Sequence, residues 1–218
     1  MKQVLILAGP SAGGKTTVAN ELLRQSSDFE LVRSVTSRPP RGDGNDGEYI
    51  YITREEFTKG IESSDVLEYT EYAGELYGTP RSEIDRITKE GRVPLLILDI
   101  KGVKALVNTP DVSACAVYVY DDIRVVDQRL YDRYLGANPS ADGLIKYVNR
   151  KEQNNADYLA APEFSKDFYS FVKNTAPAEC ADAVKAVFSA FTKGEKRDGD
   201  AVNLAVDFMI GTIRQAYM

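Results

Sequence analysis

A short glycine-rich segment near the N-terminus constrains the fold of this chain more than any other feature. Residues 9–16 read Gly-Pro-Ser-Ala-Gly-Gly-Lys-Thr and fit the pattern G-x-x-x-x-G-K-[ST]. The apolar run 3–8 predicts a buried strand before this segment, and residues 15–25 predict a helix after it. Glycines let the backbone curl so that its N–H groups point at phosphate oxygens, and the helix N-terminus adds positive potential. The sequence therefore predicts a nucleoside triphosphate site at a strand-to-helix turn.

The side chains of this segment have different expected roles. Lys15 can reach the β- and γ-phosphates and is expected to act in catalysis, and the Thr16 hydroxyl can bind Mg²⁺. The residues expected to bind the triphosphate are Gly9, Pro10, Ser11, Ala12, Gly13, Gly14, Lys15, Thr16 and Thr17.

Short apolar runs alternate with helical patterns along most of the chain. The runs 3–8, 93–99, 115–120 and 168–173 predict buried strands. The helical patterns between them favour a parallel sheet covered on both faces, which is an α/β fold. Residues 34–80 break this rhythm, alternate like antiparallel strands and are interpreted as an inserted lobe.

Composition excludes several classes of function. The 218 residues suit one domain with inserted sub-domains. Lys and Arg number 27 against 33 Asp and Glu, and the net charge of −6 disfavours a protein that coats nucleic acid. The chain has no histidine, which excludes Ser-His-Asp and Cys-His catalysis and disfavours a catalytic zinc. The two cysteines, Cys115 and Cys180, lack metal-ligand spacing, and Cys115 lies in an apolar run typical of a buried side chain.

Membrane segments are not evident in the sequence. No stretch approaches the roughly 18 apolar residues that a membrane-spanning helix needs. The opening apolar run is also too short for the core of a signal peptide. We therefore expect a cytoplasmic protein without a membrane partner.

Several further motifs follow the glycine-rich segment in order. They are Thr36-Ser37-Arg38-Pro39-Pro40-Arg41, Gly47-Glu48-Tyr49, Val66-Leu67-Glu68-Tyr69 and Tyr77-Gly78-Thr79. With these motifs the chain resembles guanylate kinase, the enzyme that transfers a phosphoryl group from ATP to GMP, over about residues 3–175. The resemblance implies a P-loop kinase fold: a parallel sheet core flanked by helices, an inserted mixed α/β GMP-binding lobe and a helical lid.

The resemblance also implies one guanylate-kinase-like domain over residues 1–218. The expected parts are a core at about 1–33, 81–122 and 158–192, a GMP-binding lobe at 34–80 and a lid at 123–157. A further C-terminal helix at about 201–214 exceeds the usual length of the family. Val202, Ala205, Met209 and Ile213 fall on one face of that helix, which either packs on its own domain or contacts a second copy.

Two groups of residues are implied to bind GMP. Those expected to hold guanine are Ser34, Glu68, Thr79 and Asp99, and those expected to hold the phosphate are Arg38, Arg41, Tyr49 and Tyr77. The residue chemistry agrees, because arginines three apart in a loop can both fork onto a phosphate. Carboxylates are acceptors that suit the N–H edge of guanine. Asp99 has a second possible role, since a shorter turn after its strand would place it on the metal side.

Arginines beyond the third predicted strand suggest the lid. Arg129 and Arg133 lie four apart on one face of a predicted helix, and Arg150 lies on the next helix. In the family such arginines close over the triphosphate and stabilise charge during transfer, so they join Lys15 and Arg38 in the expected catalytic set. The resemblance also implies that Asn174, at the end of the last strand, lies near adenine.

The implied reaction is phosphoryl transfer from Mg-ATP to GMP, and to dGMP, within purine nucleotide metabolism. The GMP phosphate is largely ionised at neutral pH, so the nucleophile needs no general base and the lack of histidine is no obstacle. Catalysis would consist of positioning and of charge neutralisation by Mg²⁺, Lys15 and the arginines. The expected partners are GMP and ATP, with no nucleic acid and no membrane, and the chain is expected to be a monomer or a homodimer.

Two alternative functions remain. One is another small-molecule kinase on the same scaffold, against which Glu68 argues together with Ser34 and Thr79. The other is a non-catalytic module that binds phosphorylated partners, against which the complete glycine-rich segment with Lys15 argues.

Overall fold

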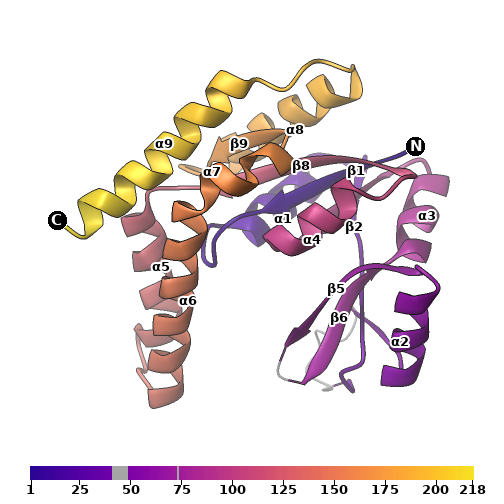
Figure 1. Ribbon diagram of the computed structural model, residues 1–218, viewed down its shortest axis with the longest axis horizontal. Helices are drawn as coiled ribbons and strands as arrows, with labels where there is room; N and C mark the ends of the chain where they lie inside the picture. Colours follow the sequence, from indigo (N-terminus) through magenta and orange to yellow (C-terminus); the bar gives the residue numbers. More distant parts are fainter. Residues whose placement is uncertain (41–48, 73) are drawn as a thin grey trace. The chain divides into compact units, whose positions relative to one another are not determined.

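The structure is a computed structural model that describes residues 1–40, 49–72 and 74–218 (Figure 1). The chain forms two compact units. We call residues 1–6 and 23–114 the first unit, and residues 7–22 and 115–218 the second unit. Every helix in the described part of the chain is too short or too polar to cross a membrane.

A five-stranded sheet has the strand order β2-β7-β1-β8-β9. Its strands are β1 (Lys2–Ala8), β2 (Phe29–Leu31), β7 (Val93–Ile97), β8 (Val112–Tyr120) and β9 (Ser170–Lys173). The pair β2–β7 is parallel with Phe29 opposite Val93, and the pair β8–β9 is parallel with Val117 opposite Ser170. The side chains of residues 4–8 are completely buried, as expected for a strand covered on both faces. The predicted α/β fold with a parallel sheet core is confirmed.

The first unit contains a second sheet, of four strands, formed by described residues between Ser34 and Pro80. It has the order β4-β3-β6-β5, with strands β3 (Ser34–Thr36), β4 (Tyr49–Tyr51), β5 (Val66–Tyr72) and β6 (Glu75–Pro80). The pairs β5–β6 and β3–β6 are antiparallel, as predicted, but the pair β3–β4 is parallel. The prediction was wrong for that pair because the long connection over residues 37–48 lets the chain re-enter the sheet in the same direction, which a tight turn cannot do.

Local signals explain helix α2 (Arg54–Glu62), which joins β4 to β5. The Thr53 side chain accepts a hydrogen bond from the Glu56 amide, and the Glu56 side chain accepts one from the Thr53 amide, which together form a capping box. Phe57 is completely buried in a small core with Val35, Val66 and Leu76. This core holds together the strands that carry the residues expected to bind GMP.

The remaining helices continue the predicted alternation of strands and helices, except for one short helix and one 3₁₀ turn before β9, which the sequence did not predict. They are α1 (Lys15–Gln25), α3 (Arg81–Lys89), α4 (Ile100–Val107), α5 (Ile123–Leu135), α6 (Ala141–Leu159), α7 (Ala161–Phe164), α8 (Pro177–Thr192) and α9 (Gly199–Ala216), with a 3₁₀ turn η2 at Ser165–Asp167. The predicted strand 93–99 ends at Ile97, because Asp99 caps α4 by accepting a 2.8 Å hydrogen bond from the Gly102 amide. In the second unit, α5 and α6 lie side by side (Figure 1).

Both cysteines lie inside the second unit. Cys115 and Cys180 are free thiols and are buried, which confirms the prediction for Cys115. Burial raises the pKa of the Cys115 thiol to about 12 and that of the Cys180 thiol to about 11. Both side chains therefore stay protonated at neutral pH and serve as small apolar groups.

The C-terminal helix α9 packs within the second unit. The predicted apolar face of Val202, Ala205, Met209 and Ile213 is buried. The helix contacts α5, α6, α7 and β9 (Figure 1). The apolar face of α9 was expected either to pack on its own domain or to contact a second copy. The structure shows that it packs within its own chain.

Candidate active site

The loop between β1 and α1 has two positions where only glycine fits. Gly9 has a φ of +148° and Gly14 has a φ of +91°. A Cβ atom at Gly9 would lie 2.1 Å from the carbonyl oxygen of Val119, and one at Gly14 would lie 2.2 Å from Nδ2 of Asn174. Both glycines that define the sequence pattern are therefore required by the backbone itself.

The carbonyl groups of this loop accept hydrogen bonds from within the second unit. Nζ of Lys15 donates to the carbonyl oxygens of Gly9 and Pro10, each at 2.8 Å. Nδ2 of Asn174, which follows β9, donates to the carbonyl oxygen of Gly13 at 2.9 Å. These bonds fix the shape of the loop around the Lys15 ammonium.

Asn154 of α6 is a site residue that the sequence did not reveal. Its Oδ1 accepts from the Ser11 amide at 2.8 Å and its Nδ2 donates to the Ser11 carbonyl at 3.0 Å. The Asn154 side chain is 1% exposed. All residues of the run 151–155 are polar, so residue type alone does not indicate which of them is buried. The one usable signal was spacing, because Asn154 follows Arg150 by four residues and so lies on the same helical face.

A cavity of about 220 Å³ lies beside the loop. Its lining comprises Ser11, Ala12, Gly14, Lys15, Thr16, Thr17, Arg133, Tyr134 and Arg150. The structure therefore brings together Lys15, Arg133 and Arg150, from α1, α5 and α6. Burial, and next the charge of Arg133, lower the pKa of Lys15 to about 8. Three cations at the N-terminus of a helix fit a polyphosphate.

Arg129, the third arginine of the predicted lid, has a different partner. Its Nη2 donates to Oδ2 of Asp121 at 3.0 Å. Asp121 follows β8 directly and its side chain is 7% exposed. The lining of the cavity beside the loop, as far as the described residues form it, includes Arg133 and leaves out Arg129. The spacing of four residues placed both arginines on one helical face, but a carboxylate at the end of β8 binds one of them.

In the first unit, three of the four residues expected to hold guanine lie together. The Thr79 hydroxyl donates to Oε1 of Glu68 at 2.6 Å. The Glu68 carboxylate lies 3.0 Å from where a Cβ atom of Gly102 would stand, and Asp99 caps the same helical turn through the Gly102 amide. Burial raises the pKa of Glu68 and the negative charge of Asp99 adds to the effect, while the Thr79 hydrogen bond opposes it. The result is a half-buried carboxylate, Glu68, beside an exposed one, Asp99, and such a pair favours a ligand with N–H donors.

Residues expected to hold the acceptor phosphate also lie together in the first unit. The guanidinium carbon of Arg38 lies 5.6 Å from the ring centroids of both Tyr49 and Tyr51. The ring of Tyr77 meets Tyr49 edge to face at 5.9 Å. Arg41, which was expected here too, lies outside the described residues.

Tyr51 is a further member that the sequence analysis missed. Its hydroxyl accepts a 3.3 Å hydrogen bond from Nη2 of Arg38. The signal was present, because Tyr51 follows Tyr49 by two residues on β4, and side chains two apart share one face of a strand.

Ser34 and Asn174 are the other two residues expected to contact a base. Ser34 opens β3, opposite Tyr49 of β4. Asn174 is 3% exposed, and among the described residues its Oδ1 has no hydrogen-bond partner. Their expected contacts with guanine and adenine stay predictions.

Protein ligands alone form no metal site within residues 1–40, 49–72 and 74–218. Among the described residues, no group of three or more Cys, Asp or Glu side chains could hold a metal ion. Mg²⁺ commonly keeps several waters and takes further oxygen ligands from substrate phosphates. The exposed Thr16, in the first turn of α1 next to Lys15, offers one hydroxyl oxygen and fits such an ion.

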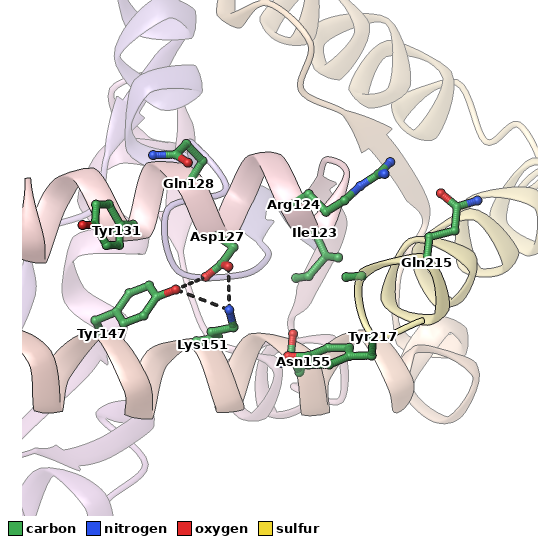
Figure 2. A pocket seen from close by; sticks show the side chains of 11 residues that line it. Ile123, Arg124, Asp127, Gln128, Tyr131, Tyr147, Lys151, Asn155, Gln215 and Tyr217 are labelled. Carbon is green, nitrogen blue, oxygen red and sulfur yellow. Dashed lines mark hydrogen bonds and ion pairs between the residues drawn. The ribbon is translucent and has the colours of Figure 1, made fainter.

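A second cavity, of about 340 Å³, lies between α5, α6 and the end of α9 (Figure 2). Figure 2 shows Tyr147 and Lys151 of α6 pointing at Asp127 of α5. Asp127 accepts from the Tyr147 hydroxyl at 2.9 Å and from the Lys151 ammonium at 2.7 Å. These charged groups bind each other, which is typical of a clamp between two helices.

The chain is similar to known proteins in both sequence and fold. The family model described as Guanylate kinase matches residues 1–174. A guanylate kinase of Thermobifida fusca is 39% identical over 191 residues, which cover 87% of this chain and 92% of that protein. A guanylate kinase of Thermotoga maritima is 31% identical over 192 residues, which cover 84% of this chain and 90% of that protein. The crystal structure of guanylate kinase from Anaplasma phagocytophilum has a similar fold, with a TM-score of 0.55 at 21% identity over 86% of this chain and 84% of that one. On these grounds the chain belongs to the guanylate kinase family.

Proposed function

We propose that this chain is an ATP:GMP phosphotransferase that forms ADP and GDP with the help of Mg²⁺ and also accepts dGMP. The observation that carries the proposal is the meeting of Lys15, Arg133 and Arg150 at one cavity beside the phosphate loop. The named relatives from Thermobifida fusca and Thermotoga maritima are guanylate kinases, and the proposal extends their activity to this chain.

The acceptor half of the proposal rests on the first unit. The carboxylates of Glu68 and Asp99 would accept hydrogen bonds from the N–H edge of guanine, with Thr79 holding Glu68 in place. Arg38 and Tyr49 would bind the phosphate of GMP. These groups read the base and the phosphate rather than the ribose, so loss of the 2′-hydroxyl in dGMP removes none of the proposed contacts.

The mechanism is positioning combined with charge neutralisation. The phosphate of GMP is already ionised at neutral pH, so it attacks without a general base. Lys15, Arg133 and Arg150 would stabilise the negative charge on the transferred group and on the leaving ADP. Thr16 would hold Mg²⁺, which when bound neutralises charge on the β- and γ-phosphates.

Two other functions are less well supported. A kinase for a sugar-like acceptor would have little use for the neighbouring carboxylates of Glu68, which is half-buried, and Asp99. A non-catalytic phosphopeptide module would not need Lys15 held inside a complete phosphate loop. The proposed setting is purine nucleotide metabolism in the cytoplasm, with GMP and ATP as partners of a monomer or homodimer.

A coupled assay of ADP formation tests the proposal. With Mg-ATP, the wild-type protein should phosphorylate GMP. AMP, CMP and UMP, each offered in place of GMP, should be much poorer acceptors. Lys15→Ala should lower turnover by orders of magnitude without unfolding the chain, whereas Lys196→Ala, an exposed lysine in the linker before α9, should not. No GDP from the wild type, or normal turnover of a folded Lys15→Ala variant, would refute the assignment.

A further inference from the structure

Asn154, a buried residue of α6, forms two hydrogen bonds with the backbone of one residue of the phosphate loop, Ser11. Asn154 pairs its amide oxygen with the Ser11 N–H group and its amide nitrogen with the Ser11 carbonyl, at 2.8 and 3.0 Å. Such two-point pairing fixes both the distance and the rotation of the Ser11 residue relative to the helix. At 1% exposure the Asn154 amide is shielded from water that would compete for these hydrogen bonds.

The contact also ties the loop to the residues that surround the phosphate cavity. Arg150 lies one helical turn before Asn154 and lines that cavity with Lys15. Asp157 lies three residues after Asn154 and acts on the charge of Lys15. One face of α6 thus presents Arg150, Asn154 and Asp157 to the loop, with the pairing to Ser11 at its centre.

The other tethers of the loop show what this contact adds. Lys15 binds the carbonyls of Gly9 and Pro10, and Asn174 binds that of Gly13. A carbonyl oxygen turned toward a phosphate would repel it, so holding these groups leaves N–H donors for the ligand. The Ser11 tether is the one that comes from the helix bearing Arg150.

We propose that Asn154 is a positioning residue for ATP: it fixes the Ser11 residue of the phosphate loop and sets Arg150 opposite Lys15, so that loop and arginine bind the triphosphate as one unit. This inference rests on the proposed function. It assigns Asn154 no contact with GMP, whose proposed residues lie in the first unit.

The test compares Asn154→Ala, Asn154→Asp and the matched control Asn155→Ala. Asn155 is the neighbouring asparagine on α6, and its amide bonds to the Tyr217 hydroxyl instead of the loop. Binding of Mg-ATP alone and of GMP alone would be measured by titration calorimetry, with melting temperatures for each variant. Asn154→Ala should weaken ATP binding about tenfold and change GMP binding less than about twofold, while Asn155→Ala changes neither. Asn154→Asp keeps the volume and one hydrogen bond, and should weaken ATP binding further because its second oxygen faces the Ser11 carbonyl.

Coupling to Arg150 separates positioning from mere stabilisation. Because Asn154 is proposed to act partly through Arg150, Asn154→Ala should weaken ATP binding by clearly less in the Arg150→Ala background than the roughly tenfold expected in the wild type. Equal weakening of ATP and GMP binding, unchanged ATP binding, or fully additive losses would overturn the inference. Failure of the wild type to phosphorylate GMP would instead refute the proposed function, while the ATP titrations would still judge Asn154.

Discussion

Asp121 holds Arg129 by a 3.0 Å hydrogen bond between carboxylate and guanidinium, at the point where β8 ends. The Asp121 side chain is 7% exposed, so this charge depends on its partner. Nη1 of Arg129 is also buried, and it has no hydrogen-bond partner in the described part of the chain. Arg129 therefore differs from Arg133, which is exposed on the same helix and lines the phosphate cavity.

The two arginines should respond differently to the same substitution. Arg129→Ala leaves the buried Asp121 carboxylate unpaired and should lower the free energy of unfolding by about 1–3 kcal/mol. Arg133→Ala should change stability by less than about 0.5 kcal/mol but lower kcat on the order of 10²-fold, because it removes a cation from the transferred phosphate. Urea unfolding and steady-state kinetics on both variants check this. Equal stability of the two variants would show that the Asp121 pair does not support the fold.

The choice of base should depend on the direction in which Glu68 presents its hydrogen-bonding groups. We predict that GMP exceeds AMP by at least about 10³ in kcat/KM, because a site built around hydrogen bonds rejects a mismatched base. In Glu68→Gln the Thr79 hydroxyl would keep the amide oxygen, which turns the amide NH₂ toward the guanine N–H groups. The variant should lose most of this preference, whereas the exposed Glu71→Gln should keep it. A wild type that uses AMP as readily as GMP would contradict the guanine site.

ATP binding should depend on pH through Lys15. Its pKa is lowered to about 8, chiefly by burial, so in the free site the ammonium loses its proton as pH rises above about 8. Bound triphosphate favours the charged form, so ATP binding near pH 8.5 should take up a proton and weaken as pH rises further. Calorimetry in buffers of different ionisation enthalpy measures this uptake. The Lys15→Arg side chain stays charged, so this variant should bind ATP without proton uptake and without the loss of affinity above about pH 8. If the variant shows the same proton uptake, the proton belongs to another group.

Acid stability should depend on Glu83 of α3. Its carboxylate accepts hydrogen bonds from Arg86 at 2.9 Å and from Arg33 at 3.0 Å, and its side chain is 5% exposed. Hydrogen bonds from Arg86 and then Arg33 lower the pKa of Glu83 to about 2. A lowered pKa in the folded state stabilises the fold above the unfolded value of about 4.5, and this contribution is lost as pH falls toward 2.

Glu83→Gln should therefore cost about 1–2 kcal/mol at pH 7, a value reduced because Arg33 is half exposed to solvent. The difference from wild type should shrink as pH falls below about 4. Glu55→Gln, an exposed residue paired with Lys59, is the matched control and should cost less than about 0.5 kcal/mol. A difference that stays constant down to pH 2.5 would assign the effect to packing instead of charge.

The sequence predicted best where spacing along one element decides the outcome. The glycine pattern predicted the phosphate loop, and the motifs of the family resemblance predicted that Glu68 and Thr79 lie together, as they do on the paired strands β5 and β6. Prediction failed where two elements meet. Asn154 is one of several consecutive polar residues, and only the rotation of α6 against the loop decides which of them is buried.

The same reason explains the different partners of the two arginines on α5. Arg129 and Arg133 are equivalent in the helical pattern, and the carboxylate that distinguishes them comes from the end of β8. The parallel pairing of β3 and β4 likewise depends on how a long connection returns to the sheet. The sequence indicates what each side chain can bind, but which partner it binds depends on how the helices and strands pack.

The burial of Cys115 and Cys180 makes the folded chain inert toward thiol reagents. A cysteine introduced at Ile145, which is 60% exposed on α6, would therefore be the single reactive thiol and could carry one fluorophore without further engineering. In the unlabelled protein, both native thiols belong to the second unit. The rate at which a maleimide modifies them therefore reports how often the structure around these two thiols opens.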